Sequence, residues 1–193
     1  GAGFLSRKAG GNALANSNGL FTYQRQTTCG FSMTARTRDG AGSGWASTEV
    51  TSTDDFDPDR VARRAIQKAV DSKKPVELTA GRRTVLLEPA AVRDLVSLLV
   101  WKLVRRRVDE KRSFLNQLSE KEVPIGESLF GTSASIASDP LDRTVPCATH
   151  SYGQPLKRTA WIENGVLRNL HVGRFWAKKT GIDPLPGPGN IIF

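Results

Sequence analysis

Four side chains in this sequence are of the types that bind zinc and similar metals most strongly. They are two histidines, His150 and His171, and two cysteines, Cys29 and Cys147. A zinc site needs three or four converging ligands, and the chain has neither an HxH nor an HExxH spacing. Cys147 and His150 stand at a C-x-x-H spacing and supply half of such a site at most. We therefore assign no metal ligand and expect two reduced thiols rather than a disulfide.

Nucleophilic and phosphate chemistry find no support in the motifs. A G-x-S-x-G turn, which would present a nucleophilic serine, is absent. Ser151 follows His150, but catalytic triads are assembled in space rather than by adjacency in the chain. Gly40, Gly42 and Gly44 are not followed by the Lys-Ser or Lys-Thr pair of a phosphate-binding loop. We assign no catalytic residue and no cofactor-binding residue, and we expect no cofactor.

The composition has an excess of positive charge, and clusters of like charge are most often solvated faces. The 193 residues have a formal charge of +9 and a pI of about 10.0, which favours nucleic acid or an acidic protein as a partner. A basic patch is predicted from two clusters, Lys73, Lys74 and Arg105, Arg106, Arg107. The string from Arg174 to Lys179 places two aromatic residues among cations, which would suit base stacking and phosphate binding. A strand with one polar face would give the same string.

The elements that would position these groups begin with a long strand. From Leu20 to Arg38, apolar and polar residues alternate, with an exception at Arg25, which predicts a strand with one buried face. Asn16 to Gly19 supplies a hairpin turn before it, and Asp39 to Gly44 a looser turn after it. Trp45 to Thr53 then returns as an antiparallel partner, so that a meander is expected.

A helix with clear boundary signals follows the meander. Asp57 is a natural N-cap, Pro58 suits the first helical position, and Pro75 ends the pattern. The acidic residues around Asp57 are explained by this helix start rather than by a carboxylate site. The apolar stripe that should face the sheet consists of Val61, Ala62, Ala65, Ile66, Ala69 and Val70.

The next segment predicts a short strand and a second helix of different character. Arg83 to Leu87 has the composition of a strand with a buried run. The helix opens at Glu88-Pro89 and is apolar on nearly all sides up to Val104, which predicts burial inside a core or against another subunit. The change to three arginines at Arg105 predicts that the C-terminal end of this helix emerges into water.

The C-terminal part is rich in strand signals. Arg158–Ile162, an Asn-Gly turn and Val166–Val172 predict a hairpin, and the final Ile-Ile-Phe predicts a strand cut short. The expected fold class is therefore α+β: an antiparallel β meander with an amphipathic helix, then a β-rich unit containing one buried apolar helix. Residues 1–81 would be the end of an N-terminal α/β-type domain, and residues 82–193 the start of a β-rich C-terminal domain.

The ends and the apolar runs of the sequence suggest its context. No run approaches the ~20 residues of a membrane helix, so we expect no membrane association. The chain begins at Gly1 without an initiator Met or a signal sequence. We expect it to be the central part of a longer cytoplasmic protein.

Several of these segments together resemble the TldD/PmbA family. The late hairpin resembles the family's strand–turn–strand signature, and Arg174 to Gly181 resembles the pattern that follows it. The turn before the long strand resembles the family's NS-x-G turn, and the match extends over nearly the whole chain. The residues that make the resemblance are Asn16, Ser17, Gly19, Trp161, Ile162, Glu163, Asn164, Gly165, Lys179 and Gly181.

The resemblance implies a function in peptide processing. In this family, whose members are labelled modulators of DNA gyrase, one subunit holds zinc on a helix with a His-Glu-x-x-x-His motif, and a PmbA-type (TldE) partner lacks that motif. Here the corresponding helix, Val96–Arg107, contains neither His nor Glu. The implied protein is a non-catalytic PmbA/TldE-like subunit of a TldD-type metallopeptidase, inactive by itself. Its expected partners are a zinc-bearing paralogue or a second copy of itself, with a peptide at the shared interface.

Two other classes of function remain open. One is a basic nucleic-acid-binding module that uses the two lysine and arginine clusters, for which affinity would fall steeply with salt. The other is an enzyme of unrecognised mechanism, which would need a convergent polar pocket that a sequence does not reveal.

Overall fold

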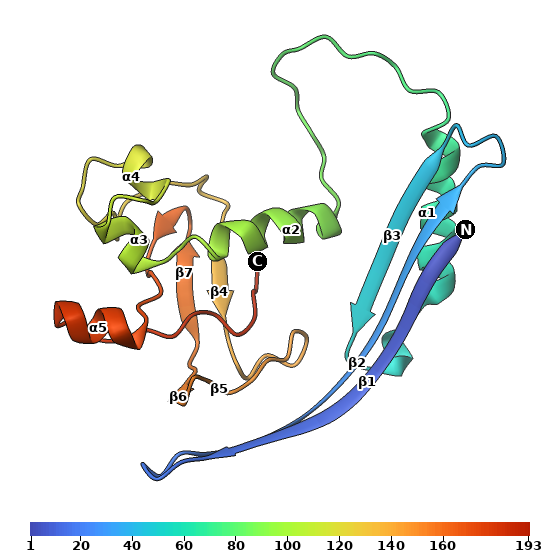
Figure 1. Cartoon of the computed structure of the whole chain (residues 1–193). Helices are drawn as coiled ribbons and strands as arrows, with labels where there is room; N and C mark the ends of the chain where they lie inside the picture. Colours follow the sequence, from blue (N-terminus) through green and yellow to red (C-terminus); the bar gives the residue numbers. More distant parts are fainter. The chain divides into compact units, whose positions relative to one another are not determined.

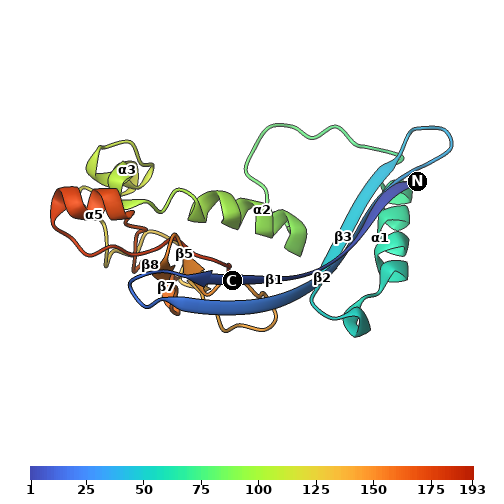
Figure 2. The same cartoon turned by 60° about the horizontal axis from the view of Figure 1, so that its bottom comes forward.

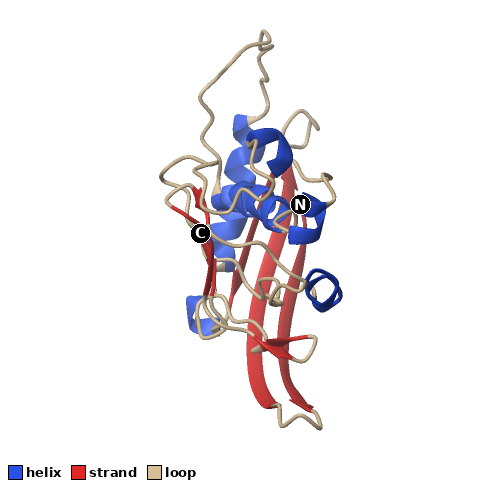
Figure 3. Cartoon of the chain, turned by 90° about the vertical axis from the view of Figure 1, so that its left-hand side faces the viewer, coloured by secondary structure: helices blue, strands red, loops and turns tan.

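Two long strands joined by a hairpin begin the chain in the computed structural model, which describes residues 1–193. β1 (Ala2–Ala15), β2 (Phe21–Arg36) and β3 (Ser43–Val50) form an antiparallel sheet in the order β1-β2-β3 (Figures 1 and 3). The predicted meander is confirmed, with β2 and β3 paired from Cys29↔Val50 to Arg36↔Ser43. β1 is not apparent from the sequence, because its Gly- and Ala-rich residues do not alternate and nearly all of them are exposed.

The chain divides into two compact units. Unit 1 contains Gly1–Asn12 and Arg25–Ala90, and unit 2 contains Ala13–Gln24 and Ala91–Phe193. The tip of the β1–β2 hairpin therefore belongs to unit 2, although the rest of the sheet belongs to unit 1. The boundary predicted near Gly81 lies in the segment between the helices α1 (Pro58–Asp71) and α2 (Pro89–Val100).

Small residues hold α1 against the sheet in unit 1. Val61, Ala65 and Ala69 are buried on α1 and pack against Ala35 and Ala46 of the sheet. At Gly44 on β3, a Cβ atom would lie 2.5 Å from the Ala69 amide nitrogen and closer still to the Ala65 carbonyl oxygen. Gly42 has a similar position against the Ala69 carbonyl. Of the glycines Gly40, Gly42 and Gly44, the last two are therefore explained by the close approach of the α1 backbone.

The predicted start of α1 is confirmed by its cap. The Arg60 amide donates a 2.8 Å hydrogen bond to Oδ1 of Asp57, and Pro58 is the first helical residue. A short 3₁₀ helix, η1 (Thr53–Asp55), precedes it and is capped by Ser52. The predicted stripe is only partly buried, because Ile66 and Val70 remain 50% and 52% exposed.

The prediction that β2 has one buried face along its whole length is wrong for its first residues. Phe21 and Tyr23 are 72% and 62% exposed, whereas Cys29 and Ala35 on the same face are buried. The reason is length. A 14-residue helix extends about 21 Å, whereas a 16-residue strand extends about 53 Å, so α1 can cover less than half of β2.

The short strand predicted at Arg83–Leu87 is also wrong. This segment has no strand partner, and its apolar side chains are exposed, with Leu86 at 99%. A strand needs a neighbour to pair its backbone groups, and residues 83–87 pair with neither β1 nor β3, the outer strands of the sheet in unit 1.

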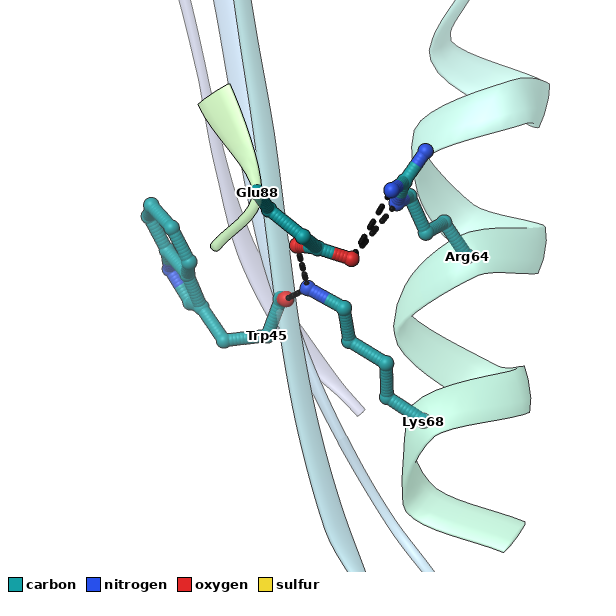
Figure 4. A network of polar contacts seen from close by, with 4 residues as sticks. All are labelled: Trp45, Arg64, Lys68 and Glu88. Atoms are coloured by element: carbon teal, nitrogen blue, oxygen red, sulfur yellow. Dashed lines mark hydrogen bonds and ion pairs between the residues drawn. The ribbon is translucent and has the colours of Figure 1, made fainter. Parts of the chain in front are cut away.

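Glu88, at the end of that segment, is fixed to α1 by a polar network within unit 1 (Figure 4). Its Oε1 accepts from Nε and Nη2 of Arg64 at 3.1 and 2.8 Å, and its Oε2 pairs with Nζ of Lys68. The same Nζ donates to the Trp45 carbonyl oxygen at 2.9 Å. The hydrogen bond from Lys68, followed by that from Arg64, lowers the pKa of the Glu88 carboxyl group.

Unit 2 is built around the strand β7 (Thr159–Glu163), which lies between β4 (Ile136–Ser138) and β8 (Val166–Leu167). Trp161 and Ile162 on β7 are 1% exposed and lie in the main apolar core with Val96 and Val100 of α2. The predicted late hairpin is confirmed, with Asn164 and Gly165 at φ 50° and 80° in its turn. Its second strand ends at Leu167, earlier than predicted.

The remaining elements of unit 2 are short. They are α3 (Arg105–Asp109), α4 (Leu115–Leu118), β5 (His150–Ser151), β6 (Gln154–Pro155) and α5 (Arg174–Thr180). The C-terminal strand prediction is partly confirmed, because Ile192 forms a two-hydrogen-bond bridge with Ala137. The strand interpretation of Arg174–Lys179 is wrong, since these residues form α5, which ends in a left-handed Gly181.

The apolar helix differs from the prediction in two respects. α2 ends at Val100 and α3 begins at Arg105, so the single helix expected up to Arg107 is broken. Only one face of α2 is buried, since Leu95, Leu98 and Trp101 are 56%, 63% and 76% exposed. The break follows from the backbone of residues 103–105, which pairs with His171 instead of continuing the helix. No helix is both long and apolar enough to cross a bilayer.

We expect Gly44→Ala to destabilise unit 1 by about 1–3 kcal/mol, because the new methyl group would push α1 away from β3. Amide hydrogen exchange in α1 measures this locally. The control is Gly10→Ala, where an added Cβ meets no atom within 4 Å. Equal protection of α1 in the two variants would contradict the packing described for Gly44.

We expect Glu88→Gln to lower the melting temperature at neutral pH, with a difference that shrinks as the pH falls. The pKa of Glu88 is lower in the folded state than in the unfolded state. The ionised carboxylate therefore stabilises the fold at pH values above the unfolded pKa, and this stabilisation is lost as the pH falls through the folded pKa. Thermal unfolding against pH measures the effect. Glu77→Gln, an exposed carboxylate of the same segment without an ion pair, should show no such dependence.

We expect Ser138→Ala to lower the free energy of unfolding by about 1–3 kcal/mol, because it leaves a buried indole N–H without its acceptor. Nε1 of Trp161 donates to Oγ of Ser138 at 3.0 Å, and both residues are buried. Chemical denaturation of Ser138→Ala, Trp161→Phe and the double variant gives the coupling between the two groups. If the losses of unfolding free energy in the two single variants simply add in the double variant, the bond does not have this role. The control is Ser133→Ala, at an exposed site, which should change the free energy of unfolding little.

Candidate functional site

A groove of about 400 Å³ in unit 2 is the best candidate for a binding site. Two strongly exposed aromatic side chains, Trp101 and Tyr152, and the imidazole of His171 line it together with small apolar residues. We call it the Pro188 groove. Its lining consists of Val100, Trp101, Val104, Ser151, Tyr152, His171, Gly187, Pro188, Gly189, Asn190 and Ile191.

One side of the Pro188 groove is formed where α2 ends. The His171 amide donates to the Leu103 carbonyl at 2.8 Å, and the Arg105 amide donates to the His171 carbonyl at 2.9 Å. These two bonds fix the backbone of His171 beside the segment that follows α2. Nδ1 of His171 lies 2.8 Å from the Leu185 carbonyl, which can only accept, so Nδ1 has the proton. In the neutral ring, Nε2 is then a free acceptor.

The other side is the segment Gly187–Ile191, which is held by its own contacts. The Asn190 side chain accepts from the Asp139 amide and donates to the carbonyls of Asp139 and Val145, at 2.6 to 2.9 Å. Gly189 packs on Cys147 so closely that a Cβ would lie 2.7 Å from the sulfur. A segment fixed in this way presents a preformed surface rather than one that orders on binding.

The chemistry of the Pro188 groove suits binding rather than bond cleavage. Its aromatic walls can cover an apolar side chain, and the amides of Gly187 and Gly189 form no hydrogen bond within the chain. Such free amides are the groups that pair with an extended peptide backbone. Ser151, Tyr152 and His171 are its side chains of nucleophile or base type, and none of them is paired with an acid.

The groove is not apparent from the sequence. Its residues come from four separate parts of the sequence, and no motif connects them. The only available signal was the alternation of Pro and Gly from Pro184 to Gly189, which the sequence analysis did not connect with binding.

The turn residues of the family signature lie at the tip of the β1–β2 hairpin. Oδ1 of Asn16 accepts from the amides of Asn18 and Leu20, at 3.0 and 3.1 Å, and Gly19 has φ 83°. Ser17 lies in the same exposed turn. This part of the signature closes a tight hairpin.

The hairpin tip also contacts the loop that contains Cys147 and His150. Oγ1 of Thr22 lies 3.2 Å from Nδ1 of His150, and Nε2 of Gln24 donates to the Cys147 carbonyl. Burial, followed by the charge of Asp139, raises the pKa of the Cys147 thiol, so the sulfur stays protonated. Both residues of the C-x-x-H pair are thus engaged in packing and hydrogen bonds.

The hairpin residues Trp161 to Gly165 have structural positions. Trp161 and Ile162 are in the core, Glu163 pairs with Arg168 at 3.0 Å, and Asn164 and Gly165 make the turn. A Cβ on Gly165 would lie 2.5 Å from the Phe130 carbonyl. Lys179 lies 5.1 Å over the Trp176 ring, and Gly181 caps α5.

The residues of the predicted basic patch fall in both units. Lys73 in unit 1 is paired with Asp39 at 2.7 Å, and Lys74 is exposed beside it. In unit 2, Arg105 is paired with Asp109 at 2.7 Å and Arg106 with Glu110 at 2.8 Å. Arg107 is exposed and has no ion pair. The lysines thus belong to unit 1 and the arginines to unit 2.

No three His, Cys, Asp or Glu side chains come together in a way that could hold a metal ion. α2, the helix on which the resemblance would place a zinc motif, has Asp94 as its only residue of these types. The residues present on α2 therefore do not fit a zinc site.

Comparison with known proteins shows two matched domains. Residues 5–73 match the PmbA/TldA metallopeptidase central domain, and residues 80–189 match the PmbA/TldA metallopeptidase C-terminal domain. Among curated proteins, none matches the chain.

Three solved structures share the fold. A protein from Bacteroides thetaiotaomicron named as a modulator of DNA gyrase is 19% identical, with a TM-score of 0.72 over 91% of this chain and 40% of its own. A protein of the same name from Thermotoga maritima is 21% identical, with a TM-score of 0.71 over 90% and 40%. TldE from Thermococcus kodakarensis is 17% identical, with a TM-score of 0.69 over 95% and 42%.

The present chain thus spans about two fifths of the length of each of these structures. At these identities the structural likeness establishes the fold alone. The two domain matches, which together include most of residues 5–189, establish the family: this chain belongs to the PmbA/TldD metallopeptidase family.

Proposed function

We propose that this chain is a non-catalytic, PmbA/TldE-like subunit of a TldD-type metallopeptidase and that its Pro188 groove binds part of the peptide. The observation on which the proposal depends is the sequence of α2. From Val96 to Arg107 the chain contains no His and no Glu, so it offers neither zinc ligands nor a general base there. The structural likeness to TldE supports the same assignment.

The groove suits a subunit that holds a substrate without cleaving it. Trp101 and Tyr152 are 76% and 91% exposed, and together they can enclose one apolar side chain of a peptide. The free amides of Gly187 and Gly189 can pair with carbonyls of an extended backbone. Nε2 of His171 can accept a hydrogen bond from a peptide amide.

A zinc-bearing paralogue is the partner that this function requires. The exposed apolar residues of α2, Leu95 and Leu98, are available to a second subunit. Peptide processing by such a complex, with this chain in the cytoplasm, accords with the two free cysteines, Cys29 and Cys147.

We expect the purified chain alone to cleave no peptide and to co-elute with a zinc-bearing paralogue when the two are co-expressed. Size-exclusion chromatography and a fluorogenic peptide assay of each fraction measure this. Hydrolysis by the chain alone would instead support an enzyme of unrecognised mechanism. Failure to associate with any such paralogue would count against the proposed role.

Trp101→Ala tests the groove separately from the assembly. We expect the reconstituted complex to form normally and its KM for peptide to rise about tenfold. A rise of this size corresponds to losing part of the apolar contact that the Trp101 ring makes with the peptide. Leu141→Ala is the matched control, because Leu141 is 80% exposed in the same unit and lies outside the groove. An unchanged KM for Trp101→Ala would contradict peptide binding at this site.

A further inference from the structure

Two motifs that are far apart in the sequence form one surface in unit 2. Nε1 of Trp176 on α5 donates to Oδ2 of Asp109 on α3 at 2.7 Å. The guanidinium of Arg106 on α3 lies over the rings of Phe175 and Trp176, at 5.9 and 5.4 Å from their centres. The two helices therefore lie against each other, as Figure 2 also shows. The arginine run at 105–107 and the Arg174–Lys179 string are neighbours in space.

This surface has a large excess of positive charge. Residues 105–112 and 174–181 contain eight cations and two carboxylates, a net +6 of the chain's +9. The two carboxylates, Asp109 and Glu110, are 19% and 26% exposed and pair with Arg105, Arg106 and Arg112. The remaining cations have no carboxylate partner, so the unpaired charge of this surface is positive; they are Arg107, Lys111, Arg174, Lys178 and Lys179. We call it the α3–α5 surface; its exposed residues are Arg106, Arg107, Lys111, Arg112, Arg174, Phe175, Lys178 and Lys179.

An exposed aromatic ring lies among these cations. Phe175 is 69% exposed, and with Arg174 and Lys178 it lines a shallow hollow of about 570 Å³. Trp176 beside it is buried and supports the surface from below. The Arg106 guanidinium contacts the Phe175 ring but leaves most of it in water, and a stacked base would cover the exposed part.

We propose that the α3–α5 surface binds single-stranded nucleic acid, with a base stacked on Phe175 and phosphates on Arg174, Lys178 and the neighbouring cations. A purely acidic polypeptide would satisfy the charges but would leave Phe175 uncovered. Unpaired bases satisfy both, because every base has an aromatic face and every nucleotide a phosphate. This site lies on elements other than α2 and is independent of the peptidase role.

The surface differs from the basic patch expected from the sequence. The lysine pair at Lys73 and Lys74 belongs to unit 1, and Lys73 is neutralised by Asp39. Lys74 therefore provides a control for nonspecific charge effects.

Fluorescence anisotropy of the full chain with a labelled oligothymidylate of about twelve nucleotides tests the proposal. We expect binding whose affinity falls with salt by a log–log slope of about −0.7 per phosphate contacted, with several contacts in total. Phe175→Ala should weaken binding about fivefold or more, through the lost stacking. Lys178→Glu should weaken it to a similar extent, and Lys74→Glu by less than about twofold.

Three outcomes would overturn the proposal. The first is a flat salt response or no binding at low salt. The second is an equal loss for Lys74→Glu and Lys178→Glu, which would reflect net charge alone. The third is that poly-glutamate binds as tightly as the oligonucleotide and that Phe175→Ala leaves the affinity for the oligonucleotide unchanged. That result would indicate an acidic polypeptide as the ligand instead. Circular dichroism of each variant shows whether it is folded, and Phe175 and Lys178 are both exposed.

Discussion

The burial of Trp161 and Ile162 on β7 is the constraint on which the C-terminal unit depends. Both side chains are 1% exposed, and the indole donates its hydrogen bond to a buried hydroxyl of β4. The core around them includes Val96 and Val100, so the same packing decides which face of α2 points inward. The remaining faces of α2 and the groove at its end are presented to the outside as a consequence. The signature hairpin is thus a structural element that positions α2 and the Pro188 groove at its end.

The local elements with strong chemical signals could be predicted from the sequence. The Asp57-Pro58 helix start and the Asn164-Gly165 turn were found because capping and positive φ depend on a few neighbouring residues. The failures came where tertiary partners decide the outcome. Leu86 has strand-like neighbours but no strand to pair with, and the helix expected up to Arg107 breaks because its backbone pairs with His171. β1 gave no periodic signal, since Gly and Ala do not mark a buried face.

The candidate sites show the same limit. The absence of His and Glu from α2 can be read from the sequence, because it depends only on residue types and not on contacts in the fold. The Pro188 groove cannot, since Trp101, Tyr152 and Gly189 are adjacent only in the fold. The two cationic strings were each visible, but their union depends on the contact between Asp109 and Trp176, which no spacing rule predicts.

The role that we propose for this member of the PmbA/TldD metallopeptidase family is to bind peptide and to assemble with a paralogue without itself activating water. The most direct measurement is the metal content and peptide turnover of this subunit after it has been separated from a reconstituted complex. We predict that the zinc remains with the paralogue and that the separated chain shows no turnover. Stoichiometric zinc retained by this chain, together with hydrolysis in isolation, would contradict the account.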